Sequence, residues 1–239
     1  MLEARHLTKF YDGARTPSLD DLNLTVRAGD VFCLLGPNGA GKTTTVNLFL
    51  NFIQPSGGEA LVCGIDAAKN PLEARAQLAY IPETVMLYGA LTGLENLCYF
   101  VEVSGLRAER PALLRLLVDA GLSEAEAARP VRGYSKGMRQ KVGVAIALAR
   151  RARALLLDEP TSGLDPLAAN EFAALIERLR GEGLAVLMVT HDLFLAKQCG
   201  TRIGVMTGGR LARVFEADDV DHLGLERAYI ELVTSGRAA

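Results

Sequence analysis

The sequence lacks the features that would place it inside a membrane, on nucleic acid or in the secretory pathway. Its longest apolar stretches, such as Val31–Leu35 and residues 184–189, are a third or less of the roughly 20 residues that a membrane span needs. The opening MLEARHLTKF has no apolar run after its charges, which argues against a signal peptide. The net charge of −2 offers no basic surface for a phosphate backbone. We therefore expect a soluble, cytoplasmic protein, unless a partner carries it to a membrane.

Cysteine is scarce as well, with four in 239 residues. Cys33, Cys63, Cys98 and Cys199 follow no metal-binding or redox spacing, and their neighbours are mostly apolar. We expect reduced and buried thiols. Repeats, low-complexity segments and long linkers are also missing, so the chain length suits one large domain or two closely fused lobes.

Short apolar runs alternate with longer helical patterns, which is typical of a parallel α/β sheet. The predicted buried strands are Val31–Leu35 and residues 154–157, 184–189 and 203–206. Residues 42 to about 54 predict a helix, which Pro55-Ser56-Gly57-Gly58 stops. Gly208-Gly209 predicts a hairpin turn into a strand at residues 210–215.

Helical signals crowd together between residues 83 and 150. Thr92 and Glu95 form a capping box before a helix that ends near Gly105, and further helices are expected at about 111–120 and 136–150. We read residues 83–150 as a helical insertion between two parts of an α/β core, 1–82 and 151–215, with a short tail at 216–239. The alternation in residues 22–26 predicts that residues 1–30 add an antiparallel sheet.

One loop carries the strongest chemical signal, because residues 36–44 fit the pattern G-x-x-x-x-G-K-[ST]. The loop consists of Gly36, Pro37, Asn38, Gly39, Ala40, Gly41, Lys42, Thr43 and Thr44. Glycines let successive N–H groups point at a phosphate, and the following helix aims its positive end at the same place. Lys42 can reach the β- and γ-phosphates, and the Thr43 hydroxyl can ligate Mg²⁺. The alternative is a glycine-rich turn that only joins a strand to a helix.

The predicted strand at residues 154–157 runs directly into two carboxylates, Asp158 and Glu159. Acidic groups at the carboxyl end of a parallel strand lie where open α/β sheets bind ligands. We assign Asp158 to Mg²⁺ and Glu159 to the attacking water, as general base. The alternative is an acidic helix cap that begins at these two residues.

Residues 133–140, GYSKGMRQ, precede a long helical pattern. Ser135 lies at the expected N-terminus of that helix, where it can act as a cap. The same geometry can hold an anion, so a plain cap and a phosphate contact are compatible.

Position by position, residues 134–138 resemble the signature motif of ATP-binding cassette (ABC) proteins. The resemblance covers about residues 2–215 and includes the phosphate loop, the signature, the acidic strand end, Ser162-Gly163-Leu164-Asp165 as a D-loop, and His191 as a switch histidine. It implies a P-loop NTPase (RecA-like) parallel-sheet core with an antiparallel β subdomain and an inserted α-helical subdomain. It also implies an ATPase that uses ATP and Mg²⁺.

The resemblance further implies that two copies, or one copy and a homologous subunit, face each other head to tail with ATP between them. Ser135 and Gly137 then contact the γ-phosphate in trans, and Asp165 connects the two sites, although Asp165-Pro166 also reads as a helix start. His191 holds the γ-phosphate, whereas by itself it is an ordinary histidine after a strand. Tyr11 matches the aromatic that stacks on adenine, and its alternative is a core or surface tyrosine.

Two departures from the family pattern indicate which branch of the family the chain resembles. Glu83 stands where the γ-phosphate-sensing loop commonly has glutamine, and the signature has Lys136 and Met138 in place of its usual glycine and glutamine. Both departures resemble ATPases paired with ABC-2 exporter-type permeases, and so does the segment 225–232. As a carboxylate near Asp158, Glu83 joins the predicted metal ligands and catalytic residues, because it would tighten Mg²⁺ binding.

The resemblance predicts the energy-coupling subunit of an ABC transporter, with transmembrane permease subunits on separate chains and without nucleic acid. Such a subunit lies peripherally on the cytoplasmic face of the inner (plasma) membrane. The permease would dock near residues 83–97, where Met86, Leu87, Tyr88 and Leu91 offer apolar surface, unless they form ordinary core. A soluble ABC ATPase that works in assembly without a permease is the alternative. A P-loop small-molecule kinase would leave residues 135–138 and His191 unexplained.

Overall fold

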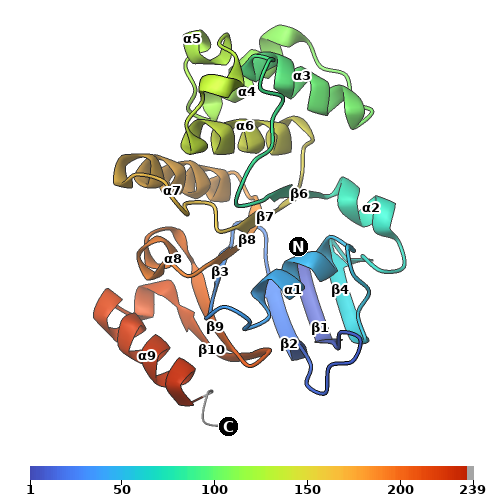
Figure 1. Ribbon diagram of the computed structural model, residues 1–239, viewed down its shortest axis with the longest axis vertical. Coiled ribbons are helices and arrows are strands. Elements are labelled where there is room, and N and C mark those ends of the chain that lie inside the picture. The colour runs from blue at the N-terminus through green and yellow to red at the C-terminus, as the bar shows by residue number, and fades with distance from the viewer. Residues whose placement is uncertain (236–239) are drawn as a thin grey trace.

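A computed structural model describes residues 1–235 and contains two β-sheets with helices packed around them (Figure 1). The core sheet has the strand order β10-β9-β3-β8-β7-β6. Its strands are β3 (Val31–Leu35), β6 (Leu78–Ile81), β7 (Ala154–Asp158), β8 (Ala185–Thr190), β9 (Arg202–Thr207) and β10 (Arg210–Glu216). All neighbours in this sheet pair in parallel except β9 and β10, which form the predicted hairpin. The four predicted buried strands are confirmed.

The smaller sheet is antiparallel throughout. Its order is β2 (Leu19–Val26), β1 (Leu2–Lys9), β4 (Gly57–Val62) and β5 (Ile65–Asp66). The alternation in residues 22–26 is confirmed, because Leu22, Leu24 and Val26 are buried and the two residues between them are exposed. Strands β4 and β5 were not predicted, because Gly57 and Gly58 indicated only the end of the preceding helix.

That preceding helix, α1 (Lys42–Phe49), is shorter than the predicted range of 42–54. Asn51 takes a left-handed conformation with φ of 54°. The N–H groups of Asn51 and Phe52 donate to the carbonyls of Leu48 and Asn47, which closes the helix with paired C-terminal turns. The prediction was wrong because it waited for proline and glycine, whereas asparagine also adopts this conformation.

The helices of the middle segment lie together at the top of Figure 1. They are α3 (Gly93–Val103), α4 (Arg110–Asp119), α5 (Glu124–Ala127), the short 3₁₀ turn η1 (Val131–Gly133) and α6 (Lys136–Ala149). The predicted capping box is confirmed, since Thr92 and Glu95 each accept a hydrogen bond from the other's backbone N–H. Helix α6 also packs against β6 and α7, so it joins this group to the core sheet.

The remaining helices are α2 (Pro71–Ala76), α7 (Pro166–Gly181), α8 (Leu193–Cys199), the 3₁₀ turn η2 (Ala217–Asp219) and α9 (His222–Ser235). Much of the predicted tail, 216–239, is therefore helical, and α9 packs beside α8 and β9 with Leu225 buried. The last four residues of that tail lie outside the described part. Among the helices of residues 1–235, none is long and apolar enough to cross a membrane.

Strand β3 shows why its sequence is continuously apolar. All five of its residues are buried, and alternate side chains enter different cores. Val31, Cys33 and Leu35 join the core formed with the helices, whereas Phe32 and Leu34 join the core shared with the smaller sheet. Because β3 is fixed on both faces, the loop that follows Leu35 has a fixed starting point.

All four cysteines are free thiols, as predicted. Cys33 and Cys199 are buried, but Cys63 and Cys98 are only half-buried, so the prediction of burial was wrong for two of the four. An apolar sequence neighbourhood does not reveal that Cys63 lies in the turn after β4, nor that Cys98 of α3 lines a cavity.

Candidate nucleotide-binding site

The phosphate loop leaves the carboxyl end of β3 and enters α1 at Lys42, so the predicted strand–loop–helix context is present. Two of its glycines are required by their surroundings. A Cβ at Gly36 would lie 2.6 Å from the Met206 carbonyl oxygen, and a Cβ at Gly41 would lie 2.6 Å from the Ser18 carbonyl oxygen. Gly41 also has a φ of 104°, which a side chain strains. The surrounding backbone therefore fixes the conformation of the loop, and the alternative of a simple connecting turn is not favoured.

Lys42 is buried inside this loop. Its Nζ donates to the carbonyl oxygens of Gly36 at 2.6 Å and Pro37 at 3.2 Å. Burial lowers the pKa of the Lys42 ammonium, and the carboxylates of Glu159 and Asp158 oppose that shift. These two carbonyls belong to the backbone of the loop, so the Lys42 ammonium helps to keep the loop closed. The same ammonium can turn outward to a phosphate.

A cavity of about 320 Å³, the phosphate cavity, opens beside the loop. It is lined by residues 38–44 together with Ser18, Glu83, Asp158, Glu159 and Val189. The structure therefore brings together predicted residues that come from three separate parts of the sequence. Ser18 and Val189 were not predicted, because nothing near them in the sequence distinguishes them from ordinary turn and strand residues.

Asp158 sits at the end of β7, where Tyr80 of β6 donates a hydrogen bond of 3.4 Å to its Oδ2. Burial and the charge of Glu159 raise the pKa of Asp158, and Glu83 adds to the rise, whereas the Tyr80 hydrogen bond and Lys42 oppose it. Burial and the charge of Asp158 in turn raise the pKa of Tyr80 to about 12, so the phenol remains a donor. A cation near Asp158 would relieve this crowding of negative charge.

Glu159 and His191, predicted as general base and switch histidine, are in contact. The His191 Nδ1 lies 2.9 Å from the Glu159 Oε2, which also accepts from the Thr190 hydroxyl at 3.2 Å. Glu159 has a φ of 46°, so the chain turns sharply at this residue. The alternative of a helix cap at residues 158–159 is wrong, because α7 begins only at Pro166 with Asp165 as its cap. Thr190 was not predicted and is marked only by its position before His191.

Ser135 and Gly137 lie at the N-terminus of α6 and are absent from the lining of the phosphate cavity. The Ser135 hydroxyl accepts a hydrogen bond of 3.3 Å from the Met138 N–H, so the predicted cap is confirmed. A Cβ at Gly137 would lie 3.4 Å from Ala168 of α7. The signature segment, residues 134–138, therefore does not line the phosphate cavity of its own chain.

The Glu83 side chain is about half exposed and reaches toward the signature segment. Its Oε1 accepts a hydrogen bond of 2.9 Å from the Ser162 hydroxyl and lies 3.6 Å from the Nζ of Lys136. Within the described residues, no group of three His, Cys, Asp or Glu could hold a metal ion by itself. Glu83 thus borders the phosphate cavity but does not complete a preformed metal cluster, and its role as a metal ligand stays a prediction.

The donors at the phosphate cavity nevertheless fit Mg²⁺ bound together with phosphate oxygens. The exposed Thr43 and the carboxylate of Asp158 line the same cavity, and both offer the hard oxygen atoms that Mg²⁺ prefers. Mg²⁺ at such sites takes one or two protein oxygens and completes its shell with phosphate and water. A hydroxyl and one carboxylate are sufficient for that arrangement.

Tyr11 lies beside the phosphate loop, with its phenolic oxygen 3.5 Å from the Thr44 Oγ1. It is 42% exposed, so the alternative of a core tyrosine is wrong. The Lys9 ammonium lies 5.4 Å from the ring centroid. An exposed aromatic face next to the loop suits a stacked base, although a surface tyrosine would look the same, and the adenine contact stays a prediction.

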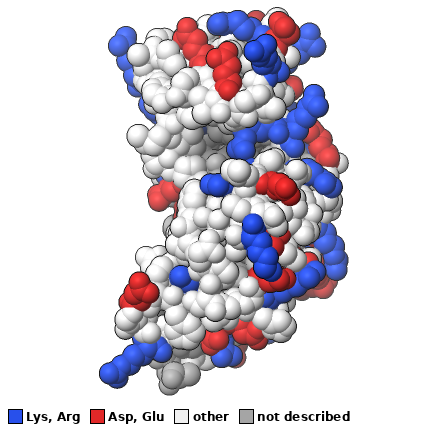
Figure 2. Space-filling view, turned by 90° about the vertical axis from the view of Figure 1, so that its right-hand side faces the viewer, with Lys and Arg blue, Asp and Glu red and all other residues white. Residues whose placement is uncertain are grey.

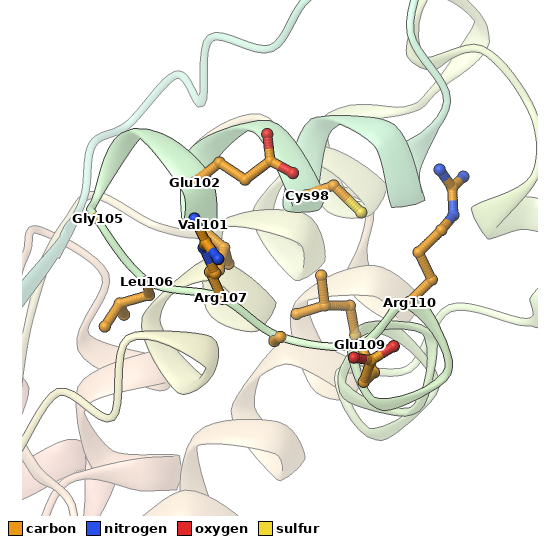
Figure 3. Close-up of a pocket in the computed structure, with 10 residues that line it drawn as sticks. Cys98, Val101, Glu102, Gly105, Leu106, Arg107, Glu109 and Arg110 are labelled. Atoms are coloured by element: carbon orange, nitrogen blue, oxygen red, sulfur yellow. The ribbon is translucent and has the colours of Figure 1, made fainter.

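A larger cavity of about 820 Å³ lies between the end of α3 and the start of α4 (Figure 3). Arg107 and Glu109 of the connecting segment line it, together with Arg110 at the start of α4 and with Cys98 and Glu102 of α3. Its lining includes no glycine-rich loop and none of the predicted site residues. Size alone therefore does not identify the nucleotide site, which is set by the phosphate loop and the acidic strand end.

Comparison with known proteins agrees with a nucleotide site at the phosphate loop. The protein-family model described as "ABC transporter" matches residues 19–162. The chain is 36% identical over 245 residues to the "Probable multidrug ABC transporter ATP-binding protein YbhF" of Escherichia coli (strain K12), which covers 98% of this chain and 42% of that protein. It is 34% identical over 237 residues to the "Bacitracin transport ATP-binding protein BcrA" of Bacillus licheniformis, which covers 98% of this chain and 75% of that protein.

A solved structure is similar as well. The "Dimeric structure of a post-hydrolysis state of the ATP-binding cassette MJ0796 bound to ADP and Pi" has a TM-score of 0.79 and 27% identity, and covers 91% of this chain and 99% of its own. The predicted fold class is confirmed. The chain spans less than half the length of the Escherichia coli relative. The match across most of the chain, together with the site geometry, shows that this chain belongs to the ABC transporter family and is one of its ATP-binding cassettes.

Proposed function

We propose that the chain is the ATP-binding and ATP-hydrolysing subunit of an ABC transporter and works in a head-to-tail dimer. One observation carries the proposal. Glu159 lines the phosphate cavity and is in contact with His191, whereas Ser135 and Gly137 lie outside the cavity at the N-terminal end of α6. A second chain, either another copy or a homologous subunit, brings its own signature segment to the open side of the cavity. The dimeric relative with ADP and Pi supports this arrangement.

Each site residue then has a chemical task. The backbone of the phosphate loop and Lys42 hold the β- and γ-phosphates, and Tyr11 stacks on the adenine. Glu159 takes a proton from the attacking water, while its contact with His191 orients both groups at the γ-phosphate. Ser135 and Gly137 of the opposite chain add donors to the same phosphate, which are present only in the closed dimer. ATP therefore stabilises the dimer, and hydrolysis releases it.

Mg²⁺, held by Thr43 and Asp158, would neutralise charge on the β- and γ-phosphates. The crowding of Asp158, Glu159 and Glu83 around the phosphate cavity supports this, because three carboxylates next to a polyphosphate need a cation between them.

The permease is expected on separate chains, and the multidrug and bacitracin relatives support the exporter-type branch. Met86 is 78% exposed and Tyr88 is 51% exposed, which suits a docking surface, whereas Leu87 and Leu91 are half-buried and belong partly to the core. On the face seen in Figure 2, an uncharged area continues from the helical part at the top down over the core. Binding of a permease at Met86 and Tyr88 would place the chain on the cytoplasmic face of the membrane.

The head-to-tail arrangement is tested with two inactive variants, Lys42→Ala and Ser135→Arg. A composite site consists of the phosphate loop of one chain and the signature segment of the other. In a dimer of either variant alone, neither of the two composite sites is intact. A mixed dimer has one intact site, made from the phosphate loop of the Ser135→Arg chain and the signature segment of the Lys42→Ala chain. An equal mixture should recover about a quarter of the wild-type phosphate release, because half of the dimers are mixed and each has one working site of two. No recovery in a mixture that forms dimers would contradict the arrangement.

Transport is tested by purification of the tagged chain from detergent-extracted membranes. Recovery of a multi-span membrane chain is expected, and Met86→Glu with Tyr88→Glu should remove it. Leu223→Glu, at an equally exposed apolar residue on α9, is the matched control and should retain it. Recovery of soluble partners only would favour the permease-free ATPase.

A further inference from the structure

The two departures from the family pattern, Glu83 and Lys136, touch each other inside one chain. They are far apart in sequence, yet the Glu83 Oε1 lies 3.6 Å from the Lys136 Nζ. Ser162 completes the contact, since its hydroxyl donates to the same Glu83 oxygen at 2.9 Å. The carboxylate at the sensing loop and the ammonium at the signature segment therefore form one structural unit.

Helix α6 holds this segment at a second point, one turn further along. The Gln140 amide donates to the backbone carbonyls of Glu83 at 3.2 Å and Pro82 at 3.4 Å. Lys136 and Gln140 are four residues apart and so lie on the same face of α6. Gln140 is fully buried, and its Oε1 has no partner in the described residues. The segment at Pro82-Glu83 is thus fixed to α6 by its backbone and by its side chain.

The charge of Glu83 matters at the phosphate cavity. Glu83 lines that cavity with Asp158 and Glu159, so three carboxylates border the same space. A third carboxylate would repel the phosphates of ATP, because charges this close are only partly screened by salt. The Lys136 side chain is 28% exposed and its ammonium lies beside that carboxylate, where it offsets the repulsion.

We propose that Lys136 is a positioning residue for Glu83 in the same chain. Together with Ser162 it holds the Glu83 carboxylate against the N-terminus of α6 and compensates its charge, so that ATP can enter the phosphate cavity. This inference rests on the proposed function and adds a cis role for a signature residue.

The test measures binding of ATP to dilute protein in EDTA, where the single chain binds nucleotide without metal or hydrolysis. Lys136→Met keeps the length of the side chain but removes its charge, and it should weaken ATP affinity about two- to fivefold, the upper part of the range expected for a partly exposed charge pair. In the Glu83→Gln background the same substitution should have no effect. Lys136→Arg should restore the wild-type affinity.

Lys141→Met is the matched control, because Lys141 is on the same helix and its ammonium lies 2.7 Å from Glu171 instead. It should leave ATP affinity unchanged. An equal loss for Lys136→Met in the wild-type and Glu83→Gln backgrounds would overturn the inference, as would an unchanged affinity accompanied by lost turnover, which would place Lys136 only across the dimer. Failure of the proposed function is distinguishable, since wild-type protein would then bind no ATP or bind it equally well after Lys42→Ala.

Discussion

The two ends of the nucleotide site differ in how they are built. The phosphate loop is defined by backbone: it follows a strand buried on both faces, its glycines lie against Met206 and Ser18, and Lys42 bridges its carbonyls. The signature segment is defined by the end of a helix, where the Ser135 hydroxyl caps α6, and neither Ser135 nor Gly137 lines the phosphate cavity. One end is complete in a single chain, whereas the other is an unmatched half.

This difference separates binding from catalysis. A loop whose conformation is enforced from both sides of the sheet can bind phosphate without reorganisation. In the proposed dimer, the N-terminus of α6 contacts a phosphate only when the opposite chain supplies one. We therefore expect the chain to bind ATP alone and to hydrolyse it in a dimer, and we expect the two regions to respond differently to mutation.

The largest effect is expected from Glu159→Gln. Turnover should fall about 10²- to 10⁴-fold, because the amide cannot accept the proton of the attacking water. ATP binding should remain, and ATP should hold the variant as a dimer in light scattering. Glu177→Gln, on the exposed face of α7, is the control and should hydrolyse ATP normally. Normal phosphate release from Glu159→Gln would mean that another group is the base.

Lys42→Ala and Ser135→Ala compare the two regions directly. Lys42→Ala should weaken ATP affinity of the single chain about 10- to 100-fold, because it removes a charge-assisted contact worth about 1.5–3 kcal/mol. Ser135→Ala should leave that affinity unchanged but lower turnover at equal protein concentration. Calorimetric titration and phosphate release measure the two quantities.

Ser123→Ala is the control for Ser135→Ala, since Ser123 caps α5 in the same way, away from the phosphate cavity. Both substitutions remove a cap worth about 1 kcal/mol. Equal losses of turnover in the two variants would indicate a general loss of stability rather than a role in phosphate contact.

Asp158→Asn should stabilise the nucleotide-free chain and abolish its response to MgATP. Burial raises the pKa of Asp158, so its charged form destabilises the fold at a pH above that raised value. The asparagine variant should gain about 2 °C in Tm at pH 8, which is modest because the carboxylate is partly exposed. The gain should disappear as the pH falls through the raised pKa toward the ordinary value of 3.8, where the carboxyl is neutral. A gain that is independent of pH would contradict this cause.

The smallest effect concerns Glu83, which links the two regions. Glu83→Gln should keep ATP binding but raise the Mg²⁺ concentration needed for half-maximal turnover about threefold, because a half-exposed carboxylate adds only modest attraction for the cation. A Mg²⁺ titration of phosphate release measures this shift. An unchanged titration would exclude Glu83 from the surroundings of the metal.

Much of the fold was readable from local pattern. The run Val31–Leu35 and the acidic strand end at Asp158 are continuous signals, and Thr92 with Glu95 is a capping box within four residues. The predictions that failed also have local causes. Strand β4 begins at a pair of glycines that indicates a turn, and α1 ends at an asparagine that indicates nothing by itself.

Within the site, the sequence determined the chemistry of each segment. It identified the phosphate loop, the carboxylates at 158 and 159 and the cap at Ser135, because these depend on residue type and on short spacing. Glu83 and Lys136 were noticed only as two separate departures from the family pattern. Only the tertiary structure decided that Tyr80 donates to Asp158, that Thr190 supports Glu159, and that Glu83 and Lys136 meet. Those contacts join β6, β7, β8 and α6, and their positions follow from the packing of the whole core. Contacts between distant segments leave no mark on either segment alone.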